Sequence, residues 1–275
     1  MKLLRHGPVG AERYGRLDEA GNIRDLFAHL PDIAPTVDNL ARVTELDAKD
    51  LPLIAPGTRL GPPVTGIGNI LCIGLNYRKH AEETNAKLPT EPLIFSKHTG
   101  ALNGPFDPVR LPPGSTMMDW EVELAVVIGR EASHIAQSHA LEYVAGYLVC
   151  NDVSERHYQK DLGGQWIKGK SCPTFCPLGP YLVTPEEITD PQNLDLWLTV
   201  NGQTMQSANT SDMIFSVAEI IAYVSRFMAL KPGDVISTGT PSGVGLGRRV
   251  FLKDGDVMEL GVAGLGTQRQ LVVAT

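Results

Sequence analysis

Residues 119–128 (DWEVELAVVI) constrain the fold more than any other part of the sequence. The second half of this segment is an uninterrupted apolar run, which is typical of a strand buried on both faces. Side chains alternate along a strand, so Glu121 and Glu123 share one face and Asp119 follows the same alternation. Such carboxylates repel one another unless a cation lies between them, and Mg²⁺, Mn²⁺ and Ca²⁺ prefer oxygen ligands. From spacing alone, a solvated polar sheet face explains the pattern equally well.

Asp152 favours the metal interpretation. It follows the apolar residues 146–151, a predicted strand, and precedes Ser154, which is suited to cap a helix. A capping or turn role is the simpler alternative for such an aspartate. Arg156 and Gln159 come next, spaced i and i+3, so they share one helical face and would look back toward Asp152. The sequence therefore predicts a site for a hard divalent cation at Glu121, Glu123 and Asp152.

Short apolar segments predict strands at residues 70–74, 93–96, 147–151, 194–200, 235–237 and 257–261. The Asn201-Gly202 pair predicts a hairpin turn after residues 194–200. Helical signals are fewer, and the clearest begins with a capping box of Ser216 and Glu219, with an apolar face that runs to Met228. Strands outnumber helices and no regular βα alternation is present, which favours a β-rich α+β fold over a doubly wound sheet.

The first 65 residues are predicted to form a small N-terminal domain. Residues 19–22 are the expected turn of a hairpin, and residues 36–46 are an expected short helix. Prolines and glycines then crowd between residues 52 and 68, which marks a connector. We therefore divide the chain into residues 1–65 and a larger domain at residues 66–275.

The net charge of -7 argues against nucleic acid as a partner, because binding phosphates requires clustered lysine and arginine. No stretch is long and apolar enough to cross a membrane. A secretory signal would need an uninterrupted apolar stretch after the basic start, and Arg5 and His6 break that stretch at once. We expect a cytoplasmic protein with reduced thiols. Cys172 and Cys176 are four apart, but no further cysteine pair or histidine cluster completes a zinc site.

Five blocks in the same order resemble the fumarylacetoacetate hydrolase superfamily across about residues 65–270. The blocks are GLNYRKH (74–80), DWEVEL (119–124), NDVSER (151–156), KS with TFCP (170–171 and 174–177), and STGTPSGVG (237–245). The resemblance implies a mixed β-roll domain, a homodimer and a bound Mg²⁺ or Mn²⁺, with Ca²⁺ as an alternative. It also implies that Glu121, Glu123 and Asp152 are the metal ligands.

The same resemblance assigns further roles. His80 and Glu83 match an acid/base pair on a lid segment, and their spacing on a helix would let the carboxylate orient the imidazole. Gln159 and Lys170 match positions that stabilise an oxyanion, while Arg156 and Thr240 match substrate contacts. Without the resemblance, the simpler alternatives are an exposed helical charge pair and solvated loop charges. Lys97, at the end of a predicted strand, is also expected to face the pocket.

Two features depart from the family. Cys172 and Pro173 replace a frequent Phe-Asp pair, which puts the local pocket shape in doubt, and no upstream aspartate supplies the additional metal ligand found in animal fumarylacetoacetases. Water would complete the metal shell.

The resemblance implies hydrolysis of a carbon–carbon bond in a small anionic 2,4-dioxo acid, such as an acylpyruvate or a diketo-deoxy sugar acid. Alternatives are isomerisation or decarboxylation of a hydroxymuconate-type acid, ureidoglycolate cleavage, or a non-catalytic metal-binding protein.

Overall fold

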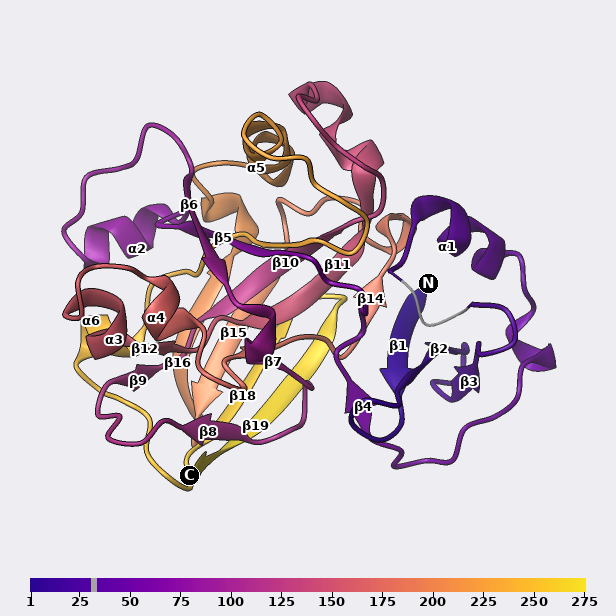
Figure 1. Cartoon of the computed structure of the whole chain (residues 1–275), viewed down its shortest axis with the longest axis horizontal. Helices are drawn as coiled ribbons and strands as arrows, with labels where there is room; N and C mark the ends of the chain where they lie inside the picture. The colour runs from indigo at the N-terminus through magenta and orange to yellow at the C-terminus, as the bar shows by residue number, and fades with distance from the viewer. Residues whose placement is uncertain (31–33) are drawn as a thin grey trace.

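The apolar run of residues 122–128 forms β10 (Val122–Ile128), a buried strand near the centre of the molecule (Figure 1). The structure is a computed structural model and describes residues 1–30 and 34–275. β10 pairs antiparallel with β11 (Val144–Asn151) on one side and with β17 (Val235–Ser237) on the other. Because β10 and β11 are buried along their whole length, their sequences are continuous apolar runs rather than alternating ones.

Two sheets contain most of the strand residues of the described chain. The strands of the larger sheet are, in spatial order, β3 (Ile23–Asp25), β2 (Arg13–Leu17), β1 (Lys2–His6), β14 (Leu182–Val183), β11, β10, β17, β5 (Ile70–Gly74) and β6 (Leu93–Lys97), with β4 (Leu60–Gly61) paired to β1. The second sheet contains β16 (Gln203–Asn209), β15 (Asp195–Val200), β18 (Val257–Val262), β19 (Gly266–Ala274) and β8 (Val109–Leu111). β10 and β11 pack against β15 and β18, so the main core lies between the sheets.

Short helices and strand pairs complete the fold. The α-helices are α1 (Val37–Thr44), α2 (Arg78–Glu83), α3 (Arg156–Lys160), α4 (Ile167–Lys170), α5 (Val217–Val224) and α6 (Gly245–Arg248). The 3₁₀ helices are η1 (Ala48–Asp50), η2 (Thr99–Ala101), η3 (Gln137–Tyr143), η4 (Pro185–Glu187) and η5 (Thr210–Asp212). β9 (Met118–Asp119) pairs with β12 (Ser154–Glu155), and β7 (Leu102–Asn103) with β13 (Cys176–Pro177). Figure 1 shows α2, α3, α4 and α6 grouped at the end of the molecule opposite the N-terminal strands.

The N-terminal strands extend the larger sheet instead of forming one of their own. β1 pairs antiparallel with β14, with Leu3 opposite Leu182 (Figure 1). The expected hairpin is present as β2 and β3, and the expected helix as α1, which Thr36 caps by accepting a hydrogen bond from the Asn39 N–H. The division of the chain at residue 65 stays a prediction, because the two parts share one sheet.

The β-rich α+β prediction is confirmed, and each predicted strand is present to within a few residues. At the predicted hairpin, Asn201 and Gly202 have φ values of 52° and 77°, which suit the tight turn between β15 and β16. The helix beginning after Ser216 is shorter than predicted and ends at Val224 rather than Met228. After Val224 the chain tightens into turns, because the Arg226 and Phe227 N–H groups donate to the carbonyls of Tyr223 and Val224, three residues back.

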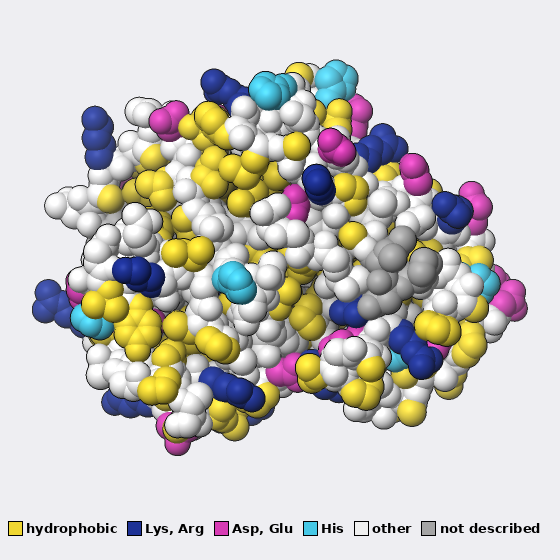
Figure 2. All heavy atoms as spheres, viewed as in Figure 1, with side chains coloured by type: hydrophobic (Ala, Val, Ile, Leu, Met, Phe, Trp, Pro, Cys, Tyr) yellow, Lys and Arg dark blue, Asp and Glu magenta, His cyan; other side chains and the backbone are white. Residues whose placement is uncertain are grey.

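The surface shows no gathering of one charge sign on the face in view. Figure 2 shows basic, acidic and hydrophobic side chains of the described residues interspersed over that face. The exclusion of nucleic acid stays a prediction. Within residues 1–30 and 34–275, no helix combines the length and apolarity needed to cross a membrane.

Candidate active site

Three carboxylates meet where β10 begins and β11 ends. Glu123 lies in β10, Glu121 directly precedes that strand, and Asp152 directly follows β11. The Asp152 N–H donates to the Glu121 carbonyl oxygen at 2.9 Å, which fixes the two chain segments together. One ligand oxygen from each of the three carboxylates lies within 4.8 Å of the others, and all three side chains are buried. The antiparallel pairing therefore brings together the triad that the sequence predicts.

Buried cations pair with two of these carboxylates. Lys170 Nζ lies 2.6 Å from Glu121 Oε2 and 2.7 Å from Asp152 Oδ2. Arg156 reaches Glu121 Oε1 at 2.5 Å. Burial opposes the charge of Glu121, but Lys170 and Arg156 outweigh it and hold its pKa well below the usual range. Burial likewise opposes the charge of Lys170, but Asp152 and Glu121 raise its pKa, so this lysine stays cationic.

Glu123 has a different environment. The Ser237 hydroxyl donates to its Oε2 at 2.6 Å and the Gly239 N–H at 2.9 Å. Among the described residues no lysine or arginine forms an ion pair with it. Burial, and then the charges of Asp152 and Glu121, raise the pKa of Glu123 well above its ordinary value. A compact set of buried carboxylate oxygens with incomplete charge compensation fits a hard divalent cation held by Glu121, Glu123 and Asp152.

His80 and Glu83 lie on α2, and His80 lines a cavity that Glu121 and Glu123 also line. His80 Nδ1 is 3.1 Å from Glu83 Oε2, as the i,i+3 spacing predicts. The Gly243 N–H also donates to the Glu83 carboxylate, at 3.0 and 3.1 Å from its two oxygens. Burial opposes the Glu83 charge, yet His80 and the Gly243 N–H lower the pKa of this carboxyl. Glu83 is therefore an anion that leaves the other ring nitrogen of His80, Nε2, available for a proton.

Helices α3 and α4 supply the remaining polar groups. Arg156 donates to Gln159 Oε1 at 3.0 Å, which leaves the amide nitrogen of Gln159 to donate elsewhere. The α4 helix packs so closely on α3 that a Cβ on Gly169 would overlap the Glu155 carbonyl oxygen and lie 2.5 Å from the Gln159 nitrogen. This close approach fixes Lys170 beside Gln159.

These groups line one cavity of about 370 Å³. The predicted site residues that it contains are His80, Glu121, Glu123, Arg156, Gln159, Lys170 and Thr240. The Thr240 hydroxyl donates to the Val122 carbonyl at 2.9 Å and accepts from Gln206 at 2.8 Å. Because both of these hydrogen bonds are made within the protein, a substrate contact by Thr240 would involve another of its atoms.

Lys97 does not face the cavity as expected. Its side chain is completely inaccessible, with Nζ 2.5 Å from Asp152 Oδ1 and 3.1 Å from the Val153 carbonyl oxygen. Asp119 also lies apart from the triad, because Arg156 and the N–H groups of Gly245 and Leu246 bind its carboxylate. Lys97 therefore holds the Asp152 carboxylate in place, and Asp119 holds the Arg156 guanidinium in place.

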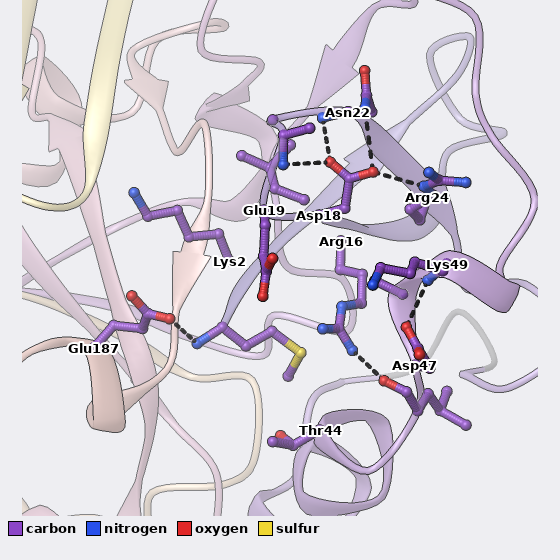
Figure 3. Close-up of a pocket in the computed structure, with 16 residues that line it drawn as sticks. Lys2, Arg16, Asp18, Glu19, Asn22, Arg24, Thr44, Asp47, Lys49 and Glu187 are labelled. Atoms are coloured by element: carbon purple, nitrogen blue, oxygen red, sulfur yellow. Dashed lines mark hydrogen bonds and ion pairs between the residues drawn. The ribbon is translucent and has the colours of Figure 1, made fainter.

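A larger hollow of about 1020 Å³ borders the N-terminal strands (Figure 3). Several of its charged groups are engaged locally: Asp18 accepts from Asn22 and Arg24, Arg16 donates to the Leu46 carbonyl, and the N-terminal ammonium pairs with Glu187. No convergent set of reactive groups faces this hollow in the described chain, so we place the active site at the carboxylate cavity.

Several residues of the site escaped the sequence analysis. Ser237 and Gly239 hold Glu123, and Phe95 and Trp166 form part of the cavity wall. Ser237 and Gly239 belong to the fifth block of the resemblance, which could have drawn attention to them. Phe95 and Trp166 gave no comparable signal.

Comparisons with known proteins identify related sequences and structures. The family model described as fumarylacetoacetate (FAA) hydrolase C-terminal matches residues 69–273. The chain is 53% identical over 275 residues to a 2,4-didehydro-3-deoxy-L-rhamnonate hydrolase from Sphingomonas sp. (strain SKA58), covering 99% of this chain and 96% of the relative.

Two solved structures are similar over the whole chain. Maleylpyruvate hydrolase from Sphingobium sp. SYK-6, solved with manganese(II) and pyruvate, has a TM-score of 0.82 at 30% identity. A 2-hydroxyhepta-2,4-diene-1,7-dioate isomerase from Mycobacterium marinum has a TM-score of 0.78 at 33% identity. In both cases 100% of this chain and 99% of the other are covered.

Proposed function

The chain belongs to the fumarylacetoacetate hydrolase family, and from this premise we propose that it is a divalent-metal-dependent hydrolase of small 2,4-dioxo acids. The observation that carries the proposal is that one cavity is lined by Glu121 and Glu123 of the buried three-carboxylate cluster and by His80 of the His80–Glu83 pair. A purely structural ion would need the first feature but not the second. The relative named as a 2,4-didehydro-3-deoxy-L-rhamnonate hydrolase supports a diketo-deoxy sugar acid as the substrate.

Glu121, Glu123 and Asp152 would hold Mg²⁺ or Mn²⁺, with Ca²⁺ as an alternative. Such an ion supplies Lewis acidity and a template for the 2-oxo acid end of the substrate. The solved relative that contains manganese(II) and pyruvate supports this choice of ion and ligand. Lys97 and Lys170 hold Asp152 from its two oxygens, so the chain itself restricts the orientation of that carboxylate.

His80 acts as the base. With Nδ1 facing Glu83, the opposite ring nitrogen takes a proton from water, and the anionic Glu83 stabilises the imidazolium that results. The hydroxide oxygen forms a bond to the C4 carbonyl carbon of the dioxo acid. Negative charge that develops on the C4 oxygen is met by the Gln159 amide and by a proton of the Lys170 ammonium.

Cleavage follows from collapse of this adduct. The C3–C4 bond breaks, its electron pair moves to C3, and the imidazolium of His80 returns the proton to C3. The products are pyruvate and the carboxylic acid of the acyl group, so one water is consumed and no oxidant is needed. Lys170 remains cationic throughout, because its two carboxylate partners raise its pKa.

Isomerisation is the second candidate, favoured by the similarity to the dienedioate isomerase. An isomerase would move a proton with His80 but would release no pyruvate. Decarboxylation and ureidoglycolate cleavage remain alternatives of the same site, and products distinguish all of them.

The test uses the full chain with Mg²⁺ or Mn²⁺ and an acylpyruvate, and follows loss of enol absorbance together with pyruvate release. We expect Glu123→Gln to lower turnover by more than about 100-fold, because it removes a ligand charge. Glu142→Gln, at an exposed position on η3, is the matched control and should leave turnover unchanged. Full activity in Glu123→Gln would refute the proposal. Ordinary metal binding without turnover of any dioxo acid would instead favour a non-catalytic binding protein.

A further inference from the structure

The cavity has two chemically different ends. Its floor carries Glu121 and Glu123 of the triad together with the polar groups of α3 and α4. The wall toward the opening is apolar and is formed largely by Leu75, Leu93, Phe95, Trp166, Val244 and Leu246. A 2,4-dioxo acid whose 2-oxo acid end lies on the floor therefore directs its acyl group along this wall.

The buried cations at the cavity floor already form ion pairs with carboxylates of the protein, so they are not free to bind a substrate carboxylate. Arg156 binds Asp119 and Glu121, and Lys170 binds Glu121 and Asp152. Among the described residues that line the cavity, Lys160 is the one cation without a carboxylate partner, and its side chain is exposed at the rim. A terminal carboxylate on the acyl group would thus lie against apolar side chains and lose hydration.

The aromatic part of the wall is fixed by its neighbours. The rings of Phe95 and Trp166 are 5.1 Å apart at an angle of 64°, an edge-to-face contact. The Lys170 ammonium lies 5.2 Å from the Phe95 ring centre, which anchors the pair to the polar floor. Trp166 precedes α4, and the Lys170 N–H donates to its carbonyl oxygen, so one short helix places both side chains.

Gly74 allows the wall to come this close to the sheet. A Cβ at this position would lie 2.8 Å from Leu93 and 3.0 Å from the Trp166 ring. Glycine at the end of β5 therefore sets the width of the wall region, since any side chain would displace Leu93 or Trp166.

We propose that Leu93, Phe95 and Trp166 form an acyl subsite that selects dioxo acids with an uncharged, hydrocarbon-ended acyl group over those with a terminal carboxylate. The proposal rests on the proposed function and specifies its substrate class. The substrate in the name of the dienedioate isomerase has a carboxylate at each end, so the proposal distinguishes this chain from that relative. It agrees with the 2,4-didehydro-3-deoxy-L-rhamnonate hydrolase, whose named substrate has a single carboxylate.

The experiment compares two acylpyruvates of equal length with the metal-loaded full chain. Butanoylpyruvate ends in a methyl group, and succinylpyruvate ends in a carboxylate at the same position. We expect kcat/KM to be about 10-fold to 100-fold higher for butanoylpyruvate, the range over which an apolar pocket discriminates. Trp166→Leu should reduce that ratio mainly through the KM of butanoylpyruvate, and acetylpyruvate, with its short tail, should be least affected. Trp197→Leu, on β15 and outside the cavity, is the matched control.

Equal or higher kcat/KM for succinylpyruvate would overturn the proposal. If Lys160→Met then abolished that preference, the rim lysine rather than the apolar wall would govern selection.

Failure of the proposed function gives a different result. If no acylpyruvate is cleaved, binding of 2-oxoheptanoate and 2-oxoheptanedioate is compared by tryptophan fluorescence, with Trp166→Phe to identify the signal. Tighter binding of the monocarboxylate would uphold the subsite without hydrolysis, and equal or weaker binding would reject it.

Discussion

Replacing Lys97 by methionine tests whether this lysine supports the metal site from behind. The side chain is fully inaccessible, and its ammonium contacts Asp152 Oδ1 at 2.5 Å and the Val153 carbonyl at 3.1 Å. Burial opposes its charge, but Asp152 raises the pKa of Lys97, so the lysine is cationic. Methionine keeps a similar length and removes the charge, which isolates the electrostatic contribution from packing.

The expected loss of folding stability comes from leaving the buried Asp152 carboxylate without one of its two lysine partners. Removing one member of a buried ion pair costs roughly 3–5 kcal/mol. Lys170 still contacts the other Asp152 oxygen, so we take the lower end, about 3 kcal/mol. For a chain of this size that corresponds to a fall in Tm of about 6–12 °C in metal-free buffer. A saturating divalent cation beside Asp152 replaces part of the lost positive charge. The difference in Tm between Lys97→Met and the wild type should therefore be smaller with metal than in chelator.

Thermal unfolding with chelator and with excess Mg²⁺ measures both effects. Lys253→Met, an exposed lysine in the loop before β18, is the control and should unfold like the wild type. An unchanged Tm for Lys97→Met in chelator would refute the reasoning. A difference that does not narrow with metal would show that Asp152 does not contribute to an ion site.

Three further predictions concern the other parts of the site. Burial and the neighbouring carboxylates raise the pKa of Glu123, so the folded metal-free protein holds a proton that the unfolded chain releases. The stability of the metal-free protein should therefore fall as pH rises above about 4.3, the pKa of the unfolded chain, toward the folded pKa. Glu123→Gln should flatten this part of the Tm-versus-pH curve. Gly169→Ala should lower stability by about 1–3 kcal/mol and also reduce kcat, because the added methyl group overlaps α3; denaturant unfolding and turnover measure both, and a fully active, stable variant would contradict the packing. Glu83→Gln should reduce kcat by about 10²–10⁴-fold with little change in KM, and a loss confined to KM would argue against a role in orienting His80.

The sequence allowed the carboxylate triad to be predicted because strand geometry is regular. Alternation places Glu121 and Glu123 on one face, and antiparallel pairing of neighbouring strands brings Asp152 to them. The short spacing of His80 and Glu83 made their contact equally predictable.

Lys97 and Asp119 could not be assigned correctly in the same way. Each lies at the end or beginning of a strand, where its side chain has a choice of partners that are distant in sequence. Lys97 binds a residue 55 positions away, and Asp119 accepts the Gly245 N–H from 126 positions away. Local periodicity carries no information about such contacts.

The distribution of charge explains how an acidic site can bind an anion. In the described chain, the network at and behind the cavity floor joins four buried carboxylates and three buried cations: Asp119, Glu121, Glu123 and Asp152 with Lys97, Arg156 and Lys170. With all four carboxylates ionised, as cation binding would require, one negative charge is left over, and it resides on Glu123, whose hydrogen-bond donors are both neutral. Arg156 and Lys170 cannot attract an oxo acid by themselves, because their charges are already balanced. A divalent cation would reverse the sign of the site to one positive charge, which a monoanionic oxo acid would then neutralise. Attraction of the substrate should therefore depend on the ion held by the triad more than on the basic side chains that the sequence first suggested.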